Sequence, residues 1–281
     1  MYLCDLHVHS DFSDGTCDPE QVVRLAKEAG LSAVALTDHN SIDGLDLFLA
    51  AGDKYGIKTV PGIEISTDYN GVELHVVSLC FEKEYFSKIK EFMSIQKARK
   101  EESNRLLALK LSENGYKVNY EEILAKTTGF PNRVHFAKEL IEKGYIKTIE
   151  EGFETILSEE QGYYVPPKRL TVFETLEFIN SIKGVSVLAH PLLNLTKEEL
   201  VDFLPRAIKC GLDAIEVRYS KYDYEKQNFS EKIVKDFNLL PSGGSDFHGE
   251  NKPDIFIGSG CGNLQIPYDY LLKLEERKTE K

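Results

Sequence analysis

Short apolar runs alternate with longer amphipathic segments along most of the chain. Seven apolar runs are typical of buried strands: residues 3–8, 33–37, 59–65, 73–79, 185–189, 214–217 and 239–243. Helical spacing of apolar residues predicts helices over residues 19–30, 44–55, 172–182, 197–210 and 224–237. Strands that alternate with helices of this length predict an α/β fold with parallel pairing and right-handed crossovers, and seven such strands can close a barrel.

Polar side chains gather at or near the C-terminal ends of these runs. They are His7, His9, Asp38, His39, Glu64, His190, Glu216 and Asp246. In a β/α barrel the rim at the C-terminal ends of the strands carries the chemistry. The pattern therefore places a candidate site at that rim, with Glu216 left without a role because it could orient a neighbour or be structural.

One region breaks the alternation. From residue 85 to 169 the pattern is helical throughout, with residues 87–114 forming one long charged helix or two. We expect a barrel domain over residues 1–84 and 170–281 and an inserted helical subdomain over 85–169. Insertions beside a barrel mouth usually shape substrate choice rather than reaction type. The charged residues 275–281 are expected to be a disordered tail.

Composition and charge narrow the class of protein. Five cysteines without a CxxC spacing indicate neither a disulfide framework nor a thiolate zinc site, and a reducing cytoplasm fits best. No apolar run approaches the roughly 20 residues needed to cross a bilayer, so we expect a soluble protein with no membrane contact. The net charge of −12 argues against binding long nucleic acid through a basic face and favours small molecules or short oligomers. Protein partners are not indicated.

Five of the seven histidines lie within two positions of a carboxylate or another histidine. His7 and His9 share one face of an extended backbone, as do Asp246 and His248, because residues two apart point the same way. Imidazole and carboxylate together suit Zn, Mn or Fe, whereas oxygen ligands alone suit Mg or Ca. The sequence therefore predicts a polynuclear metal site.

The order of these motifs resembles the polymerase and histidinol phosphatase (PHP) superfamily of metal-dependent phosphoesterases over nearly the whole chain. The motifs are His7-Val8-His9, Ser13-Asp14-Gly15, Thr37-Asp38-His39, the separate Glu64 and His75, Ala189-His190-Pro191, and Gly244-Ser245-Asp246-Phe247-His248-Gly249. Within the superfamily the chain is most similar to bacterial nucleotide phosphoesterases with a helical insertion between the fourth and fifth strands. These relatives hydrolyse 3',5'-bisphosphonucleotides or trim short 5'-phosphorylated RNA.

The resemblance implies a distorted seven-stranded (β/α)7 barrel that holds three divalent metal ions, with manganese first and iron or zinc as alternatives. It places one ion among His7, His9, Glu64 and Asp246, a second among Glu64, His75 and His190, and a third among Asp14, His39 and His248. Nine side chains leave each ion short of four to six ligands, so water and substrate oxygens must complete the coordination. Asn40 departs from the commonest pattern, in which Asp follows Thr-Asp-His, but it is not among the expected ligands.

Substrate contacts are expected from the insertion. Residues 131–137 resemble an Arg-Pro-His segment that contacts phosphate in these relatives, with Val134 in place of Pro, which makes Arg133 and His135 candidates. Arg99 and Lys168 are further candidates, and Tyr163 or Tyr164 could be a platform for a base. Arg presents a planar fork that matches phosphate oxygens. Arg99 could equally belong to a solvated helix face.

The expected reaction is hydrolysis of a phosphate ester by in-line attack of a hydroxide that bridges two metals. His7, His9, Glu64, His190 and Asp246 would be the catalytic set, and the acid for the leaving group is unassigned. Three alternatives stay open: a histidinol phosphate phosphatase, an amidohydrolase, and a metal-binding scaffold module without activity. The helical insertion disfavours the first, the lack of a Lys at a strand end disfavours the second, and the full set of nine ligands disfavours the third.

Overall fold

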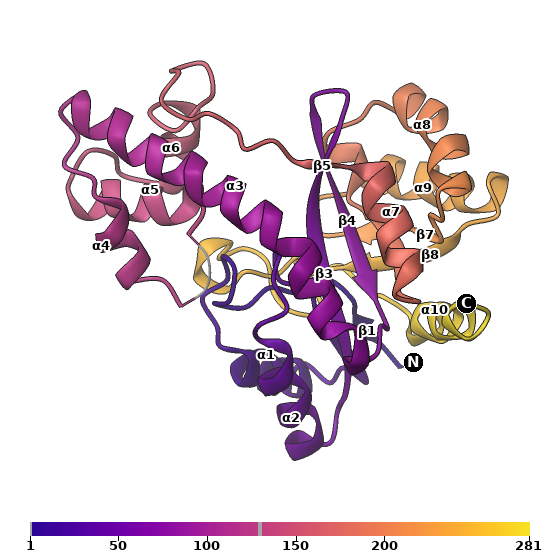
Figure 1. Cartoon of the computed structure of the whole chain (residues 1–281). Coiled ribbons are helices and arrows are strands. Elements are labelled where there is room, and N and C mark those ends of the chain that lie inside the picture. Colours follow the sequence, from indigo (N-terminus) through magenta and orange to yellow (C-terminus); the bar gives the residue numbers. More distant parts are fainter. Residues whose placement is uncertain (1, 129–130) are drawn as a thin grey trace.

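Seven of the eight strands of the sheet follow one another around a barrel in the computed structural model, which describes residues 2–128 and 131–281 (Figure 1). Their order is β1 (Cys4–Asp5), β2 (Ala33–Leu36), β3 (Lys58–Tyr69), β4 (Val72–Leu79), β6 (Val185–Ala189), β7 (Ala214–Tyr219) and β8 (Leu240–Gly244). The last strand returns to the first, because Leu6 N–H donates to Gly243 O (3.2 Å) and Asp246 N–H donates to His7 O (2.8 Å). The sheet is therefore a nearly closed seven-stranded barrel, which confirms the predicted fold class.

The expectation of uniformly parallel strands was wrong at β4. This strand pairs antiparallel with both β3 and β6, whereas the other neighbours in the barrel are parallel. Asn70 (φ 54°) and Gly71 (φ 86°) make a tight turn between β3 and β4, and both lie in the left-handed region that such hairpin turns require. The Asn-Gly pair was a hairpin signal in the sequence. Because β4 runs in reverse, His75 near its start lies at the same rim as the ends of the other strands.

Helices surround the barrel and bury their apolar faces on it. They are α1 (Pro19–Glu28), α2 (Leu45–Tyr55), α7 (Val172–Ser181), α8 (Lys197–Lys209), α9 (Tyr224–Asp236) and α10 (Tyr268–Thr279) (Figure 1). Alternate residues of β2 face opposite sides: Val34 and Leu36 join the core under the helices, and Ala33 and Ala35 join the smaller core inside the barrel. This is the period-two burial of a strand covered on both faces.

The C-terminal residues are ordered as a helix, so the expected charged tail was wrong. Leu271 and Leu274 of α10 are fully buried against the residues that fill the barrel. Burial of this apolar stripe stabilises a helix whose last turn is almost entirely charged. No helix within the described residues is long and apolar enough to cross a membrane.

The insertion begins with the 3-10 turn η1 (Lys83–Tyr85) and one continuous helix, α3 (Phe86–Glu113). The first half of α3 buries Ile89 and Met93 in the barrel core, and the second half buries Leu107 and Leu111 in a separate core. That second core also includes residues of α4 (Tyr120–Ala125), α5 (Arg133–Glu142) and α6 (Ile149–Glu154). We refer to residues 107–128 and 131–164 as the helical lobe.

Figure 1 shows the helical lobe at one end of α3, away from the barrel. The chain returns through β5 (Leu170–Thr171), which pairs with β3. The sequence analysis missed this short strand. The domain boundary at residues 85–169 stays a prediction, and residues 129–130 of that range lie outside the described ones.

Candidate metal centre

The nine predicted ligands converge at the C-terminal rim of the barrel. His7, His9 and Asp14 follow β1, His39 follows β2, Glu64 and His75 lie in β3 and β4, His190 follows β6, and Asp246 and His248 follow β8. Seven of them are buried, and His39 and His75 are partly exposed. Residues up to 241 positions apart in the sequence, His7 and His248, are thus brought into one cluster.

Glu64 is the centre of this cluster and is fully buried. Each of its two carboxylate oxygens faces a different set of histidines. Oε2 lies 3.1 Å from His7 Nε2, 3.2 Å from His9 Nε2 and 3.1 Å from His39 Nδ1, and Oε1 lies 2.9 Å from His75 Nδ1 and 3.1 Å from His190 Nε2. One carboxylate in contact with five imidazoles is the arrangement expected of a bridging ligand.

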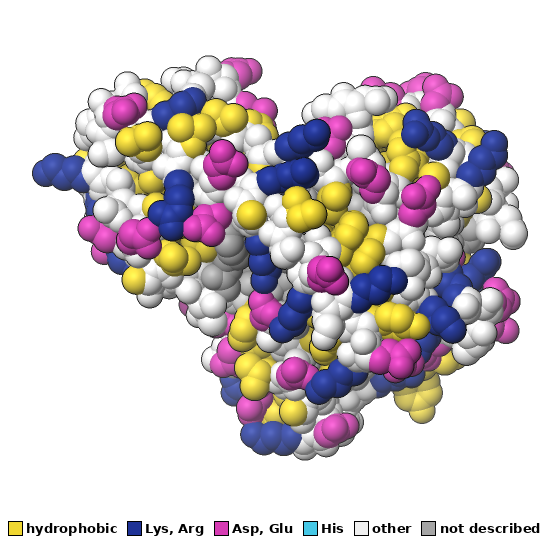
Figure 2. All heavy atoms as spheres, in the orientation of Figure 1, with side chains coloured by type: hydrophobic (Ala, Val, Ile, Leu, Met, Phe, Trp, Pro, Cys, Tyr) yellow, Lys and Arg dark blue, Asp and Glu magenta, His cyan; other side chains and the backbone are white. Residues whose placement is uncertain are grey.

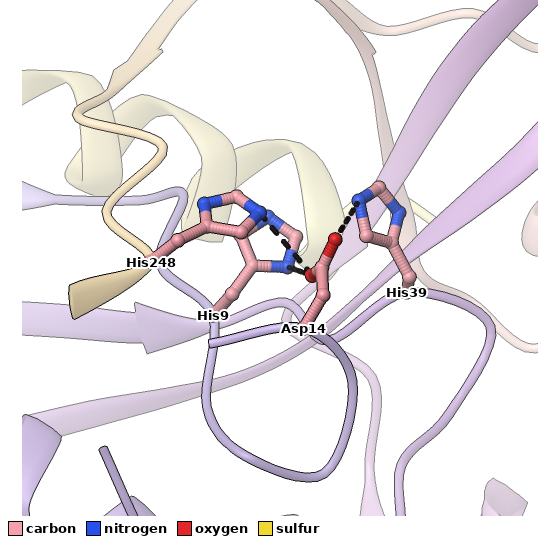
Figure 3. Close-up of side chains that lie close together, drawn as sticks. All are labelled: His9, Asp14, His39 and His248. Atoms are coloured by element: carbon pink, nitrogen blue, oxygen red, sulfur yellow. Dashed lines mark ion pairs between the residues drawn. The ribbon is translucent and has the colours of Figure 1, made fainter. Parts of the chain in front are cut away.

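Asp14 is the second focus (Figure 3). Its Oδ1 lies 3.2 Å from His248 Nε2 and 3.8 Å from His9 Nδ1, and its Oδ2 lies 3.9 Å from His39 Nε2. Figure 3 shows the three imidazoles pointing at this carboxylate from separate segments of the chain. His9 therefore belongs to both foci, because its Nε2 faces Glu64 and its Nδ1 faces Asp14.

Several of these atoms lack any hydrogen-bond partner. Among the described residues they include His7 Nε2, both ring nitrogens of His9, His39 Nδ1, Asp14 Oδ1 and Glu64 Oε2, all buried. A buried polar atom without a partner costs about 1–3 kcal/mol, so a native cluster of six needs an explanation. The atoms lie close together without hydrogen-bond geometry, as donors around a shared cation would. The cluster therefore fits divalent metal ions.

The donor atoms fall into four overlapping groups, each with all atoms within 4.8 Å of one another. The groups are His9, Asp14, His39 and His248; His7, His9 and Asp246; His7, Glu64 and His190; and His39, Glu64 and His75. The first group contains one predicted set (Asp14, His39 and His248) together with His9, and the second contains His7, His9 and Asp246 of another predicted set without Glu64. The remaining predicted set differs, because His75 and His190 both contact Glu64 but stand in different groups.

Electrostatics in the cluster reflects crowded carboxylates and imidazoles. Burial by itself would lower the pKa of His75, but the carboxylates of Glu64 and Glu73 outweigh it and raise the pKa to about 10. Burial would raise the pKa of Glu64, but the surrounding histidines hold it well below its usual range. By contrast, burial lowers the pKa of His39 to about 3 and also lowers that of His248, so the histidines of the cluster do not share one charge state.

Glu216, which the sequence left without a role, orients two of the predicted ligands. Its Oε1 accepts from His7 Nδ1 (2.9 Å) and its Oε2 accepts from the backbone N–H of His190 (2.7 Å). A proton on Nδ1 leaves the Nε2 lone pair of His7 free to face Glu64 and a cation. Such carboxylate–histidine pairs fix the tautomer and the ring orientation of metal ligands.

Asp38 holds the loop that carries Asp14. Its carboxylate accepts from Ser10 N–H (2.8 Å), Ser10 Oγ (2.6 Å) and Ser13 Oγ (2.6 Å). The Asp and the His of the Thr-Asp-His motif therefore differ in role: Asp38 shapes a loop and His39 faces the cluster.

Three residues near the cluster have left-handed backbones although none is glycine. They are Asn40 (φ 53°), His190 (φ 31°) and Asp246 (φ 57°). Asn40 is tied to β3, because its Oδ1 accepts from Ser66 N–H (3.0 Å), which agrees with its expected place outside the ligand set. Such conformations cost on the order of 1–3 kcal/mol each and persist where the surroundings hold them.

A cavity of about 270 Å³ opens beside the cluster, between the barrel and α3. Asp14, His39 and His75 line it on the cluster side. Among the other lining residues are four cations, Lys97, Lys100, Arg133 and Arg169. On the outer face, Figure 2 shows several Lys and Arg side chains between the helical lobe and the barrel, with Asp and Glu side chains among them. The sequence analysis missed Lys100 and Arg169, whose role depends on packing of the insertion against the rim.

Arg133 and His135, the two substrate residues predicted from the motif, differ in whether they line the cavity. The Arg133 guanidinium lies in the cavity wall, 4.2 Å from the ring centre of Tyr164 and 5.0 Å from that of Phe153. His135 is not among the lining residues; its Nδ1 accepts from Asn132 N–H (3.2 Å) at the start of α5. Burial lowers the pKa of His135 to about 4, so its ring is neutral.

Arg99 and Lys168 contact each other rather than the cavity. Arg99 Nη1 donates to the Lys168 carbonyl (3.2 Å), and neither residue lines the cavity. Tyr164 lies in the cavity wall, whereas Tyr163 packs edge-on against Tyr116. Of the four predicted substrate residues, Arg133 lines the cavity and His135, Arg99 and Lys168 do not; the substrate role itself stays a prediction.

Comparison with known proteins identifies a matching family and several similar proteins. The PHP domain family model matches residues 5–165. A 5'-3' exoribonuclease of Haemophilus influenzae is 30% identical over 87% of this chain and 89% of its own, and a 3',5'-nucleoside bisphosphate phosphatase of Chromobacterium violaceum is 27% identical over 91% of both. The structure of a protein assigned to the metal-dependent phosphoesterases, from Bifidobacterium adolescentis, covers 98% of this chain and 96% of that one, with a TM-score of 0.87 and 26% identity.

Proposed function

We propose, starting from the fact that the chain belongs to the PHP domain family of metal-dependent phosphoesterases, that it hydrolyses nucleotide phosphate esters. The substrates that we propose are 3',5'-bisphosphonucleotides, from which it would remove the 3'-phosphate, and short 5'-phosphorylated RNA. The observation that carries this choice is a pair of cations, Lys100 and Arg133, that make no ion pair within the described residues and line a cavity that opens onto the metal centre.

The four cations of the cavity are not equivalent. Lys97 pairs with Asp43 (3.0 Å) and Arg169 pairs with Glu73 (2.6 Å). Within residues 2–128 and 131–281, Lys100 and Arg133 have no such ion pair. Burial lowers the pKa of Lys100, and only the more distant charges of Asp14 and Glu73 oppose this shift. An anion bound between Lys100 and Arg133 would supply the missing partner.

The metal centre and the Lys100–Arg133 pair are two positions that could each bind a phosphate group of one substrate. A reacting phosphate would lie at the metal centre and a second phosphate at Lys100 and Arg133, as in a nucleoside with phosphates on both its 3' and 5' oxygens. The aromatic rings of Phe153 and Tyr164 in the wall suit a nucleobase or ribose face. The volume is near the lower end of small-molecule sites, about 300–1,000 Å³, which favours one nucleotide inside the cavity.

The metal assignment that we propose is the one implied by the family. His7, His9, Glu64 and Asp246 would hold one ion, Glu64 with His75 and His190 a second, and Asp14, His39 and His248 a third, with manganese before iron or zinc. When bound, such cations neutralise phosphate charge and bring the pKa of a coordinated water towards 7. This assignment is supported by three buried atoms that have no hydrogen-bond partner and could each bind a metal ion: His7 Nε2, His9 Nδ1 and Glu64 Oε2.

The side chains of this protein would do the rest of the work. Glu216 and Asp38 hold His7 and the Asp14 loop before the substrate arrives, which lowers the cost of organising the site. Lys100 and Arg133 would anchor the second phosphate and so align the ester bond at the centre. Their binding energy would therefore act on orientation as well as affinity.

A direct test measures phosphate release, with Mn²⁺ present, from adenosine 3',5'-bisphosphate, adenosine 3'-phosphate and histidinol phosphate, and nucleotide release from an RNA trinucleotide with and without a 5'-phosphate. We expect kcat/KM to favour the bisphosphate over the monophosphate by about 10–100-fold, the value of one or two charge-assisted contacts. Lys100→Met and Arg133→Met should remove this preference and leave adenosine 3'-phosphate hydrolysis nearly unchanged. Lys235→Met, an exposed charge on α9, is the matched control.

Three results would contradict parts of the proposal. Hydrolysis of histidinol phosphate alone would keep the chemistry and overturn the substrate. Equal rates with and without the second phosphate would overturn the role of Lys100 and Arg133. If His9→Ala and Glu64→Ala both fold, lose their metal and keep full turnover, the metal mechanism is wrong.

A further inference from the structure

Lys252 is a cation built into the metal centre, and neither the family motifs nor the proposed mechanism assigns it a role. It follows η3 (Gly249–Asn251), just after His248, and its Nζ lies 2.7 Å from Asp246 Oδ2. The backbone of Lys252 is fixed on both sides. Its N–H donates to Gly249 O (3.1 Å) and its carbonyl accepts from the N–H of the buried Ile255 (3.0 Å). The Lys252 side chain therefore reaches Asp246 from a backbone position that the fold fixes.

The two oxygens of Asp246 have different surroundings. Oδ2 accepts from both Lys252 Nζ and Tyr219 OH (2.8 Å). Oδ1 faces the histidines instead, at 3.3 Å from His9 Nε2 and 3.8 Å from His7 Nε2. One oxygen is thus saturated by protein donors, and the other is left for a cation in the group of His7, His9 and Asp246.

We propose that Lys252 weakens the binding of the cation held by His7, His9 and Asp246, because its ammonium shares the negative charge of Asp246 with that cation. The proposal rests on the proposed role of Asp246 as a metal ligand. Lys252 acts through Asp246 and does not line the substrate cavity, so it is a positioning residue and not a catalytic one. Tyr219 holds the same oxygen without adding a charge, and this difference separates orientation from electrostatics.

The charge argument predicts the opposite sign from a merely structural role. If Lys252 only fixed the loop or the carboxylate, its removal would loosen Asp246 and weaken cation binding. If its charge opposes the cation, a neutral residue of similar length should strengthen binding. The Lys252 side chain is 30% exposed, so water screens part of this repulsion, and we expect a change of about tenfold.

The test is isothermal titration of the metal-free protein with Mn²⁺, which needs no substrate. Lys252→Met and Lys252→Gln should each bind Mn²⁺ about tenfold more tightly at one class of sites than the wild type. Lys252→Arg, which keeps the charge, should bind as the wild type does. Tyr219→Phe should bind more weakly, because it removes an orienting hydrogen bond without removing a charge. Lys235→Met controls for the change in net charge.

The outcomes separate this inference from the proposed function. If the folded wild-type protein binds no Mn²⁺, the proposed metal ligands are wrong and the role of Lys252 with them. If the wild type binds Mn²⁺ and both neutral variants bind it equally well or more weakly, Lys252 is structural and only this inference is overturned. Circular dichroism of each variant identifies a misfolded protein, and two neutral substitutions keep the test decisive if one of them does not fold.

Discussion

Replacing Glu216 by Gln should weaken cation binding without removing any proposed ligand. Glu216 lies in β7, is buried, and accepts hydrogen bonds from His7 Nδ1 and from the backbone N–H of His190. Gln has the same shape but replaces one acceptor oxygen with an NH₂ group. If the NH₂ group faces His7, the imidazole must accept there and carry its proton on Nε2, the atom that faces Glu64. If it faces His190, two donors meet in a buried position.

The expected loss of Mn²⁺ affinity follows from these two orientations of the introduced amide. A buried donor left without an acceptor costs about 1–3 kcal/mol. Loss of outer partners of metal ligands typically weakens metal affinity by about 10–100-fold, which corresponds to roughly 1.4–2.7 kcal/mol. The two estimates agree, so we expect the Kd for Mn²⁺ in the Glu216→Gln variant to rise by about 10–100-fold.

Isothermal titration of the metal-free protein with Mn²⁺ measures this Kd directly. Glu198→Gln, an exposed change of the same kind in the first turn of α8, is the control. Circular dichroism and the Tm show whether Glu216→Gln has kept the fold. A correctly folded variant with wild-type affinity would refute the idea that Glu216 sets the tautomer of His7.

Three further predictions concern the backbone, the Asp14 loop and protons. Gly244→Ala places a Cβ 2.1 Å from His7 Cβ, so urea denaturation should show a loss of about 3 kcal/mol or more. Asp38→Asn loses an acceptor that holds the loop of Asp14, and titration with Mn²⁺ should give an affinity about tenfold lower. The raised pKa of His75, about 10, means that a cation must displace a proton from this imidazole at any lower pH. Mn²⁺ affinity should therefore rise from pH 6 to pH 8, by up to about tenfold per pH unit for each proton released. A pH-independent affinity would contradict this prediction.

The ligand set is the part of the site that the sequence predicts best. Imidazole and carboxylate side chains are scarce in apolar runs. His7, Glu64 and His190 can therefore be recognised in the sequence without knowledge of the fold. The alternation of runs and helices also predicted the barrel, because the period of burial is a local property of each element. Arg133 was predicted differently, through the resemblance of residues 131–137 to a phosphate-contacting segment of relatives.

The substrate side was harder to predict, because its residues are ordinary in their local context. Lys100 is one of many charges on α3, and the sequence cannot show that it, rather than Arg99, faces the cavity. The direction of β4 was likewise missed, although Asn70-Gly71 was a local sign of the turn.

The sequence alone determined a barrel-forming pattern and nine histidine and carboxylate side chains of the kinds that bind metal ions. Only the tertiary structure decided how these groups act on one another. Glu64 meets five histidines because a closed barrel brings every strand end to one rim, and His75 joins them because β4 is reversed. Lys252 and Glu216 gain their roles in the same way, since a charge or a hydrogen bond acts over a few ångströms of space, whatever the separation along the chain.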